Sequence, residues 1–433
     1  MRFLQVPFLS IKIVFLKTFK QPLHYIVLLI LAGEAVFILP FVLARVFRAT
    51  VLEVFTITNT EIGYCFSIYG LVALASYLLG GPLADKFPPR KLMGTALLLT
   101  AAGGLVYANQ PSFTTLTFLY GFWGFTTIFL FWAAMIKATR VWGGSANQGK
   151  AFGFLDGGRG LVGALFGLLG VAVFAWFVPD NTVTLNTFQQ REAFTMVVYI
   201  SSALVAFIGI LVLFFLKSNV SEEKVLKEKI TKANIKSVLK LPSVWLLMII
   251  ILCAYTGYKI TDIFSLYARE VLGYSEVAAA KTGTFLLFIR PVVGVTIGFL
   301  ADRARPSIYL LAGFLFSILG AVLFASGILE PGTHTMFFLT IIITAIGVYA
   351  ARVLYFAVLK EGKIPLTLTG TAVGIISFIG YTPDIYAGPV IGYFLDNFET
   401  VQGHYYVFWI LGMFSIVGLI ASFLFLLISK KND

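Results

Sequence analysis

The chain has 433 residues, of which 59% are hydrophobic and 12% charged, and its formal net charge is +12. Soluble globular proteins are about 45–50% apolar and about 25% charged. The composition therefore excludes a soluble enzyme, a disordered chain and a fibrous protein, and is typical of a polytopic membrane protein. The basic excess then reflects lysines and arginines gathered in cytoplasmic loops, and we expect no nucleic-acid partner.

Apolar stretches long enough to cross a bilayer recur along the whole chain. A membrane-spanning helix needs about 20 mostly apolar residues. Where one apolar run is too long for a single helix, Asn109, Gln110 and Pro111 divide it with a turn. The sequence predicts an all-α fold with twelve transmembrane helices, at residues 23–46, 61–83, 92–108, 113–136, 150–177, 194–216, 242–267, 278–301, 307–328, 333–357, 366–395 and 402–429.

The distribution of basic residues predicts which side of the membrane each loop occupies. With a cytoplasmic N-terminus, the loops on that side hold most of the lysines and arginines, including seven lysines within residues 217–240. Because positive charge collects in cytoplasmic loops, we expect both termini in the cytoplasm. The loops on the other side then hold only Arg45, Arg48, Arg191, Arg269 and Lys281.

Two short repeats indicate that the chain consists of duplicated halves. The run Gly81–Lys86 recurs as Gly298–Arg303, and the run Gly149–Gly153 recurs as Gly370–Gly374, at offsets of 217 and 221 residues. Two matches in the same order at nearly the same offset favour internal duplication. We expect a six-helix bundle at residues 1–216, a cytoplasmic linker at 217–240 and a second six-helix bundle at 241–433.

The first repeat resembles a loop pattern of the major facilitator superfamily, found between its second and third helices. The matching residues are Gly81, Leu83, Asp85, Lys86, Arg90 and Lys91, with a second, shortened copy at Gly298, Leu300, Asp302, Arg303 and Arg305. Pro88 and Pro89 depart from the pattern. The resemblance implies two pseudo-symmetric six-helix bundles that rock about one central site.

A second stretch narrows the resemblance to a branch of that family. Residues 131–140 and 148–153 are similar to the YihN-like bacterial inner-membrane transporters, and more loosely to the sugar-phosphate and organic-anion branches. This resemblance implies a multi-pass protein of the bacterial inner membrane but names no substrate.

The acids of the repeated loop are candidates for a conformational latch. A carboxylate near a helix end accepts hydrogen bonds from backbone amides and guanidinium groups, so it can join two helices in one conformation only. The alternative is a solvated turn that obeys the positive-inside rule. The candidate latch residues are Gly81, Asp85, Lys86, Arg90, Lys91, Gly298, Asp302 and Arg303.

A few ionisable residues fall inside the predicted spans, where a charge is costly and marks function by default. Asp156 and Arg159 share a helix face at a spacing of three residues, as do Lys259 and Asp262. The alternative for each pair is an internal ion pair that stabilises packing. The full set is Glu34, Asp156, Arg159, Lys259, Asp262, Arg290, Arg352 and Asp384.

Glu34 and the arginines suggest the coupling and binding roles. Glu34 has no charged residue within one helical turn, which favours exchange of a proton at that carboxyl. The alternative is a protonated carboxyl that bonds a neighbouring helix. Arg290 also lacks an acid nearby on its own helix, so its partner is a substrate anion or an acid of another helix, such as Asp384 or Asp156. Arg352 can instead extend to the inner membrane surface.

The eleventh predicted span carries Pro383 and Pro389 among several glycines, and we expect it to bend beside the central site. Tyrosines of the last six spans are candidate hydroxyl donors there, although ordinary packing is the alternative. The candidate substrate-binding residues are Arg159, Arg290, Asp156, Tyr255, Tyr258, Lys259, Arg352, Tyr381 and Asp384.

Together these features predict a secondary active transporter for a small polar metabolite, most simply an anion, with Glu34 coupling transport to protons. The alternatives are a carrier of a neutral solute such as a sugar, nucleoside or amino acid, a drug efflux pump, and an integral-membrane enzyme. We expect a monomer in the lipid bilayer with no cofactor and no metal, because the three histidines and two cysteines form no ligand cluster in the sequence.

Overall fold

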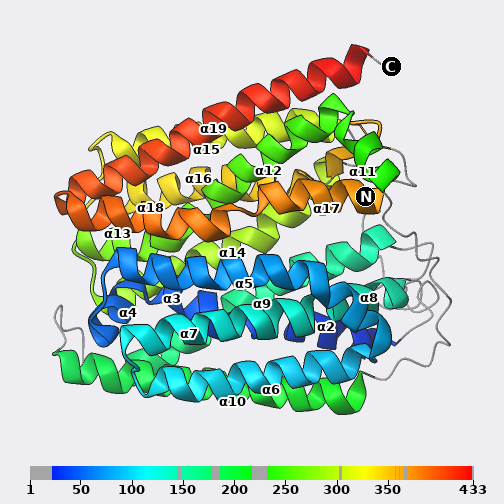
Figure 1. Ribbon diagram of the computed structural model, residues 1–433. Helices are drawn as coiled ribbons and strands as arrows, with labels where there is room; N and C mark the ends of the chain where they lie inside the picture. The colour runs from blue at the N-terminus through cyan, green and yellow to red at the C-terminus, as the bar shows by residue number, and fades with distance from the viewer. Residues whose placement is uncertain are drawn as a thin grey trace, which may run out of the picture.

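The computed structural model describes residues 22–143, 148–177, 186–216, 232–301, 305–355, 357–359, 361–364 and 369–431, which form helices and turns without a strand. Figure 1 shows the helices running side by side in two stacked groups. The N-terminal group consists of α2 (Leu23–Phe37), η1 (Ile38–Val42), α3 (Leu43–Val46), α4 (Arg48–Phe55), α5 (Asn59–Lys86), α6 (Pro89–Ala108), α7 (Phe113–Gly124), η2 (Phe125–Trp132), α8 (Ala133–Gly143), α9 (Gln148–Trp176) and α10 (Thr187–Phe215).

The C-terminal group lies against the first, with α19 on its far side (Figure 1). It consists of α11 (Lys232–Leu239), α12 (Pro242–Ile260), η3 (Thr261–Ile263), α13 (Phe264–Glu270), α14 (Glu276–Ala301), α15 (Pro306–Ala325), α16 (His334–Leu354), η4 (Ala357–Leu359), α17 (Thr369–Gly380), α18 (Pro383–Asn397) and α19 (Thr400–Lys431).

Local sequence explains where many of these helices begin. The Thr58 hydroxyl accepts a bond from the Glu61 amide while the Glu61 carboxylate accepts one from the Thr58 amide, which caps the start of α5. Asn186 and Gln189 form the same arrangement before α10. Proline occupies the first turn of α6, α12, α15 and α18, where its missing N–H costs nothing.

The all-helical membrane fold is confirmed, and ten of the predicted spans are long and apolar enough to cross a bilayer within the described residues. The other two differ. The span predicted at 61–83 lies in α5, a helix of 28 residues that is not among the ten. The span predicted at 366–395 is interrupted at Tyr381 and Thr382, which separate α17 from α18 directly before Pro383. Pro383 has no backbone N–H to donate to the Ile379 carbonyl, which accepts the Thr382 amide at 3.1 Å instead, and this accounts for the break.

Hydrophobic packing is largely separate in the two groups. One buried cluster takes nearly all of its residues from the N-terminal helices, and two others come from the C-terminal helices alone. The groups meet where α5 packs along α18 and where α9 packs along α14. The domain limits at 216 and 240 stay a prediction, since residues 217–231 lie outside the described residues.

The crossing of α5 and α18 depends on glycine. A Cβ atom built on Gly388 would lie 2.9 Å from the Cα of Gly63, so only hydrogen at these positions permits the approach. This crossing lies near the start of α5. We call this side of the molecule the Asn59 end and the opposite side the Lys86 end. At the Lys86 end, α17 packs on α12 and α11 of its own group.

Candidate functional site

Four charged side chains meet between α2, α9 and α14, and we call them the charge square. Arg159 Nε lies 3.3 Å from Glu34 Oε2, and Arg159 Nη1 lies 3.9 Å from Asp156 Oδ1. Arg290 contacts the same two acids from the C-terminal group, at 3.9 Å from Glu34 and 3.6 Å from Asp156. Glu34, which has no charged residue within one turn of its own helix, is therefore paired by two arginines that approach it from other helices.

The square is closely supported on one side. A Cβ atom on Gly163 would lie 2.8 Å from Glu34 Oε1, so this glycine makes room for the carboxylate. The Arg159 guanidinium lies over the rings of Phe37 and Trp132, at 5.4 and 5.6 Å from their centroids. Cation–π contacts of this kind hold a guanidinium in place where water is scarce.

The square is loosely bonded although three of its four side chains are buried. Its ion pairs span 3.3–3.9 Å, and Glu34 Oε2, Arg159 Nε and Arg290 Nη2 are buried without a hydrogen bond. Buried polar atoms normally have partners. The square therefore retains bonding capacity that a polar ligand can use.

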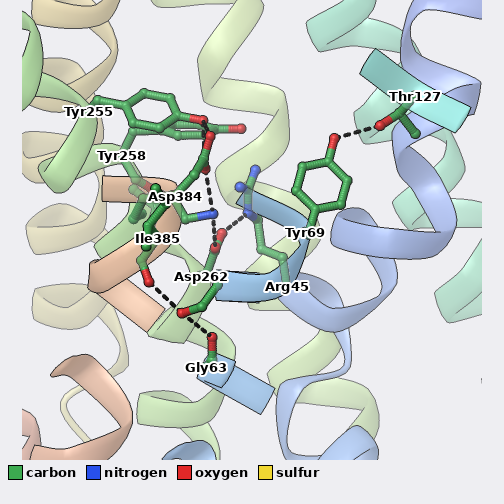
Figure 2. A network of polar contacts seen from close by, with 12 residues as sticks. Arg45, Gly63, Tyr69, Thr127, Tyr255, Tyr258, Asp262, Asp384 and Ile385 are labelled. Atoms are coloured by element: carbon green, nitrogen blue, oxygen red, sulfur yellow. Dashed lines mark hydrogen bonds and ion pairs between the residues drawn. The ribbon is translucent and has the colours of Figure 1, made fainter. Parts of the chain in front are cut away.

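A second network joins the two groups of helices (Figure 2). Arg45 of α3 lies 2.5 Å from Asp262, and Lys259 lies 3.9 Å from Asp262 and 3.3 Å from Asp384. The Tyr255 hydroxyl donates to both oxygens of Asp384, at 3.0 and 3.1 Å. The pairing of Arg290 with Asp384 that the sequence left open is not observed, since Asp384 is engaged by Lys259 and Tyr255.

Arg45 is a site residue that the sequence analysis missed. It lies at the end of the first predicted span and counts among the basic residues of the outer loops, yet the structure leaves it only 5% exposed. Its backbone oxygen also accepts a 2.6 Å bond from Ser265 of α13. The chain continues as α4 directly beyond the predicted span, so this arginine does not lie in a loop.

Arg352 of α16 points into the protein instead of toward the membrane surface. Its guanidinium carbon lies 3.5 Å from the centroid of the Tyr258 ring and 5.7 Å from that of Tyr255. Tyr255 in turn contacts Tyr381 edge-on at 4.8 Å. The snorkelling alternative for Arg352 is therefore wrong.

The predicted binding residues thus gather in two adjoining places between the helix groups. We call the eight ionisable residues that the sequence places inside the spans, with Arg45 added, the central charge set. It comprises Glu34, Arg45, Asp156, Arg159, Lys259, Asp262, Arg290, Arg352 and Asp384.

The two groups are fastened at the Asn59 end. The carboxylate of Asp396, at the end of α18, accepts the amide hydrogens of Asn59 and Thr60 at 3.0 and 2.6 Å. A carboxylate at a helix N-terminus is favoured by the unpaired amides and by the helix dipole. Thr50 donates to Glu276 at 2.9 Å across the same side.

The latch residues are only partly visible. Gly81 and Asp85 lie in α5, and Gly298 lies in α14, whereas Asp302 and Arg303 lie outside the described residues. Lys86 and Lys91 are exposed and Arg90 is half-buried. Lys137 donates to the Ala84 carbonyl at 3.0 Å, which brings a further cation to this end of α5.

Membrane-length helices in two packed groups, with charges buried between them, define a polytopic helical membrane protein. Residues 25–387 match the family model of the Major Facilitator Superfamily, so the chain belongs to that family. It is 30% identical over 380 residues to the inner membrane protein YqcE of Escherichia coli, covering 86% of this chain and 87% of the relative. It is 28% identical over 406 residues to the inner membrane protein YihN of the same organism, covering 91% and 93%.

Solved structures agree on the fold. A bacterial homologue of the human lysosomal transporter Spinster superposes with a TM-score of 0.71 at 16% identity, covering 93% of this chain and 96% of that one. The nucleoside transporter NupG gives a TM-score of 0.68 at 15% identity, covering 92% and 99%. The resemblance to the family and its YihN-like branch is confirmed.

Proposed function

We propose that the protein is a secondary active transporter that moves a small, acidic metabolite across the bacterial inner membrane without converting it chemically. The observation that carries the proposal is the charge square, which places two arginines from different helix groups around two carboxylates at loose distances. A guanidinium binds a carboxylate or phosphate in preference to a neutral group. Membership of a transporter family supports the same function.

The transport cycle follows from the contacts between the helix groups. The bundles at 1–216 and 241–433 rock about the central charge set, joined by the linker at 217–240. By the positive-inside rule the Lys86 end and both termini are cytoplasmic. The contacts of Asp396 and Glu276 then close the outer side, and the protein acts as a monomer with its site reached from the cytoplasm.

Proton coupling arises because Glu34 shares its arginines with the substrate. When an anion binds Arg290, the guanidinium stabilises the ionised form of Glu34 less. Proton uptake by that carboxyl then becomes more favourable. When the anion leaves, the arginine returns to Glu34 and the proton is released. One proton thus accompanies one anion in the same direction.

The test uses the full chain in liposomes that contain a pH-sensitive dye. A mixture of small sodium carboxylates added outside should acidify the lumen with the wild-type protein, and Glu34→Gln should abolish the acidification while anion exchange continues. Glu330→Gln, which removes an exposed acid, is the matched control.

Two outcomes would contradict the proposal. Unchanged acidification with Glu34→Gln would remove Glu34 from the coupling role. Uptake of a neutral sugar, nucleoside or amino acid, with no uptake of any carboxylate, would favour the neutral-solute alternative instead.

A further inference from the structure

Arg352 differs from the other cations of the central charge set in its partners. Arg45, Arg159, Lys259 and Arg290 each lie within 4.0 Å of at least one carboxylate. Among the described residues, no carboxylate lies within that distance of Arg352, whose guanidinium rests on the Tyr258 ring.

The hydrogen bonds of Arg352 are also incomplete. Its Nη1 atom is buried and has no hydrogen-bond partner in the described part of the chain, although the residue as a whole is only half-buried. Arg48 likewise has no described carboxylate, but two of its nitrogens donate to Asn59 at 3.2 and 3.0 Å near the Asn59 end. A buried donor without a partner is costly, so the Arg352 guanidinium is poised for an acceptor that is not part of the chain.

Arg352 lies at the same depth as the charge square. The Tyr349 hydroxyl donates to the Leu286 carbonyl at 3.4 Å, which fixes α16 against α14 one turn before Arg352 and one turn before Arg290. One turn further, a Cβ atom on Gly294 would lie 3.8 Å from Val353. The two arginines therefore stand on neighbouring helices at one level of the bundle.

The charges of the set leave one cation over. Its nine side chains comprise five cations and four carboxylates, and the ion pairs account for every member except Arg352. With Glu34 ionised, a ligand with a single negative charge would balance the set, whereas a neutral solute would leave the Arg352 cation unpaired, and one such guanidinium matches one acid group.

We infer that Arg352 binds the acid group of the transported solute, and that this solute is a monoanion of the carboxylate type. The inference rests on the proposed function and assigns its anchor. Stacking on Tyr258 holds the planar guanidinium before the ligand arrives, so little side-chain freedom is lost on binding. Arg290 and Arg159, which already have acids, respond to the ligand through the square.

The experiment measures binding and uptake separately. Purified full-length protein is incubated with a defined mixture of benzoate, phenylacetate and gluconate and their neutral amides, and the retained compounds are identified by mass spectrometry. The same mixture is offered to liposomes that contain the protein. The variants are Arg352→Gln, Arg352→Lys and Lys281→Gln, which removes an exposed cation from α14 as the matched control.

We expect the wild type and Lys281→Gln to retain carboxylates over their amides by at least tenfold. Arg352→Gln should reverse this preference while still binding the amides, which shows that the variant is folded. Arg352→Lys should bind carboxylates more weakly than the wild type, since an ammonium lacks the planar fork and the ring stacking.

Each other outcome is decisive. Retention of carboxylates by Arg352→Gln at the wild-type level would overturn the role of Arg352 even if uptake continues. If carboxylates are retained only when Arg352 is present, but none is taken up into liposomes, the role of Arg352 in binding would be supported and the transport proposal contradicted. Neither retention nor uptake of any carboxylate by the wild type would overturn both.

Discussion

Glu34 and Asp156 lie between the same two arginines, but their surroundings differ. The Glu34 side chain is 5% exposed, whereas that of Asp156 is 59% exposed. Asp156 therefore forms the side of the charge square that solvent can reach, and Glu34 forms the side packed against Gly163. An anion anchored at Arg352 in our proposal reaches Arg290 from the Asp156 side, and Glu34 responds after it.

The partner assignment of Arg290 can be tested by removing charges in pairs. Arg290→Ala should lower stability by about 3 kcal/mol, because it leaves buried acid without its counter-charge. Adding Glu34→Gln, which neutralises that buried acid, should restore most of the loss, measured by thermal unfolding in detergent in a double-mutant cycle. The matched control adds Asp384→Asn instead, and rescue by that variant would contradict the observed geometry.

Sequence spacing found the local pairs of the site but not its long-range ones. Asp156 with Arg159 and Lys259 with Asp262 do lie within ion-pair distance, since three residues place two side chains on one helix face. The shorter contacts of Arg159 with Glu34 and of Arg45 with Asp262 join different helices. Those contacts depend on how each helix is rotated about its axis, which the order of residues along one span does not specify.

Among the elements, α5 and α18 provide the main contact at the Asn59 end. Their glycines allow the backbones to cross closely, and the Ser67 hydroxyl donates to the Ile385 carbonyl beside the crossing. The two Asp396 contacts with the first turn of α5 lie beyond it. This helix pair is therefore joined by backbone groups more than by apolar side chains, and such contacts can be exchanged without exposing a hydrophobic surface.

The Asp396 contacts should matter for closure of this end. Asp396→Asn keeps the shape of the side chain but removes its charge. Loss of the charge–dipole interaction and of the charge-assisted hydrogen bonds should destabilise the closed state by about 1–2 kcal/mol. We expect faster thiol labelling of Ser67→Cys, measured in a background without Cys65 and Cys253. Glu399→Gln, an exposed acid nearby, should leave labelling unchanged, and equal effects of both variants would contradict a specific role of Asp396.

The eleventh span shows what element-level prediction achieves. Pro383 and its neighbouring glycines pointed to a bent helix, and the chain does break there. The sequence did not indicate that the two parts of this span pack on different helix groups. α18 packs on α5 of the other group, whereas α17 packs on helices of its own group.

At the scale of the whole molecule, the described contacts between the groups lie at the Asn59 end and around the central charge set. We expect the repeated loop at the Lys86 end to act as a latch in the opposite, outward-facing conformation. Asp85→Asn should then slow uptake by about tenfold while leaving binding unchanged, because a charged hydrogen bond contributes about 1.5–3 kcal/mol to the outward-facing state only. Uptake assays in liposomes check this, with Glu53→Gln as the control acid. Normal uptake by Asp85→Asn would assign this acid to a solvated turn.

The membrane class, the helical fold and most spans could be predicted because apolar length is a property of each segment alone. The family could be predicted because its loop pattern is local as well. The central charge set could only be collected as candidates, since its pairs unite helices separated by up to 256 residues, as between Glu34 and Arg290.

The cation left over at Arg352 has an electrical consequence. Moving one elementary charge through 100 mV changes the free energy by about 2.3 kcal/mol. The empty protein carries this extra positive charge between its halves, and the protein loaded with a monoanion and its coupled proton carries the same net charge. An inside-negative membrane voltage therefore favours the cytoplasm-open state of both. The voltage speeds the inward step of the loaded carrier and slows the return of the empty carrier, so a full cycle moves no net charge. Transient currents recorded under voltage clamp without substrate would reveal the return step as slower at more negative voltages.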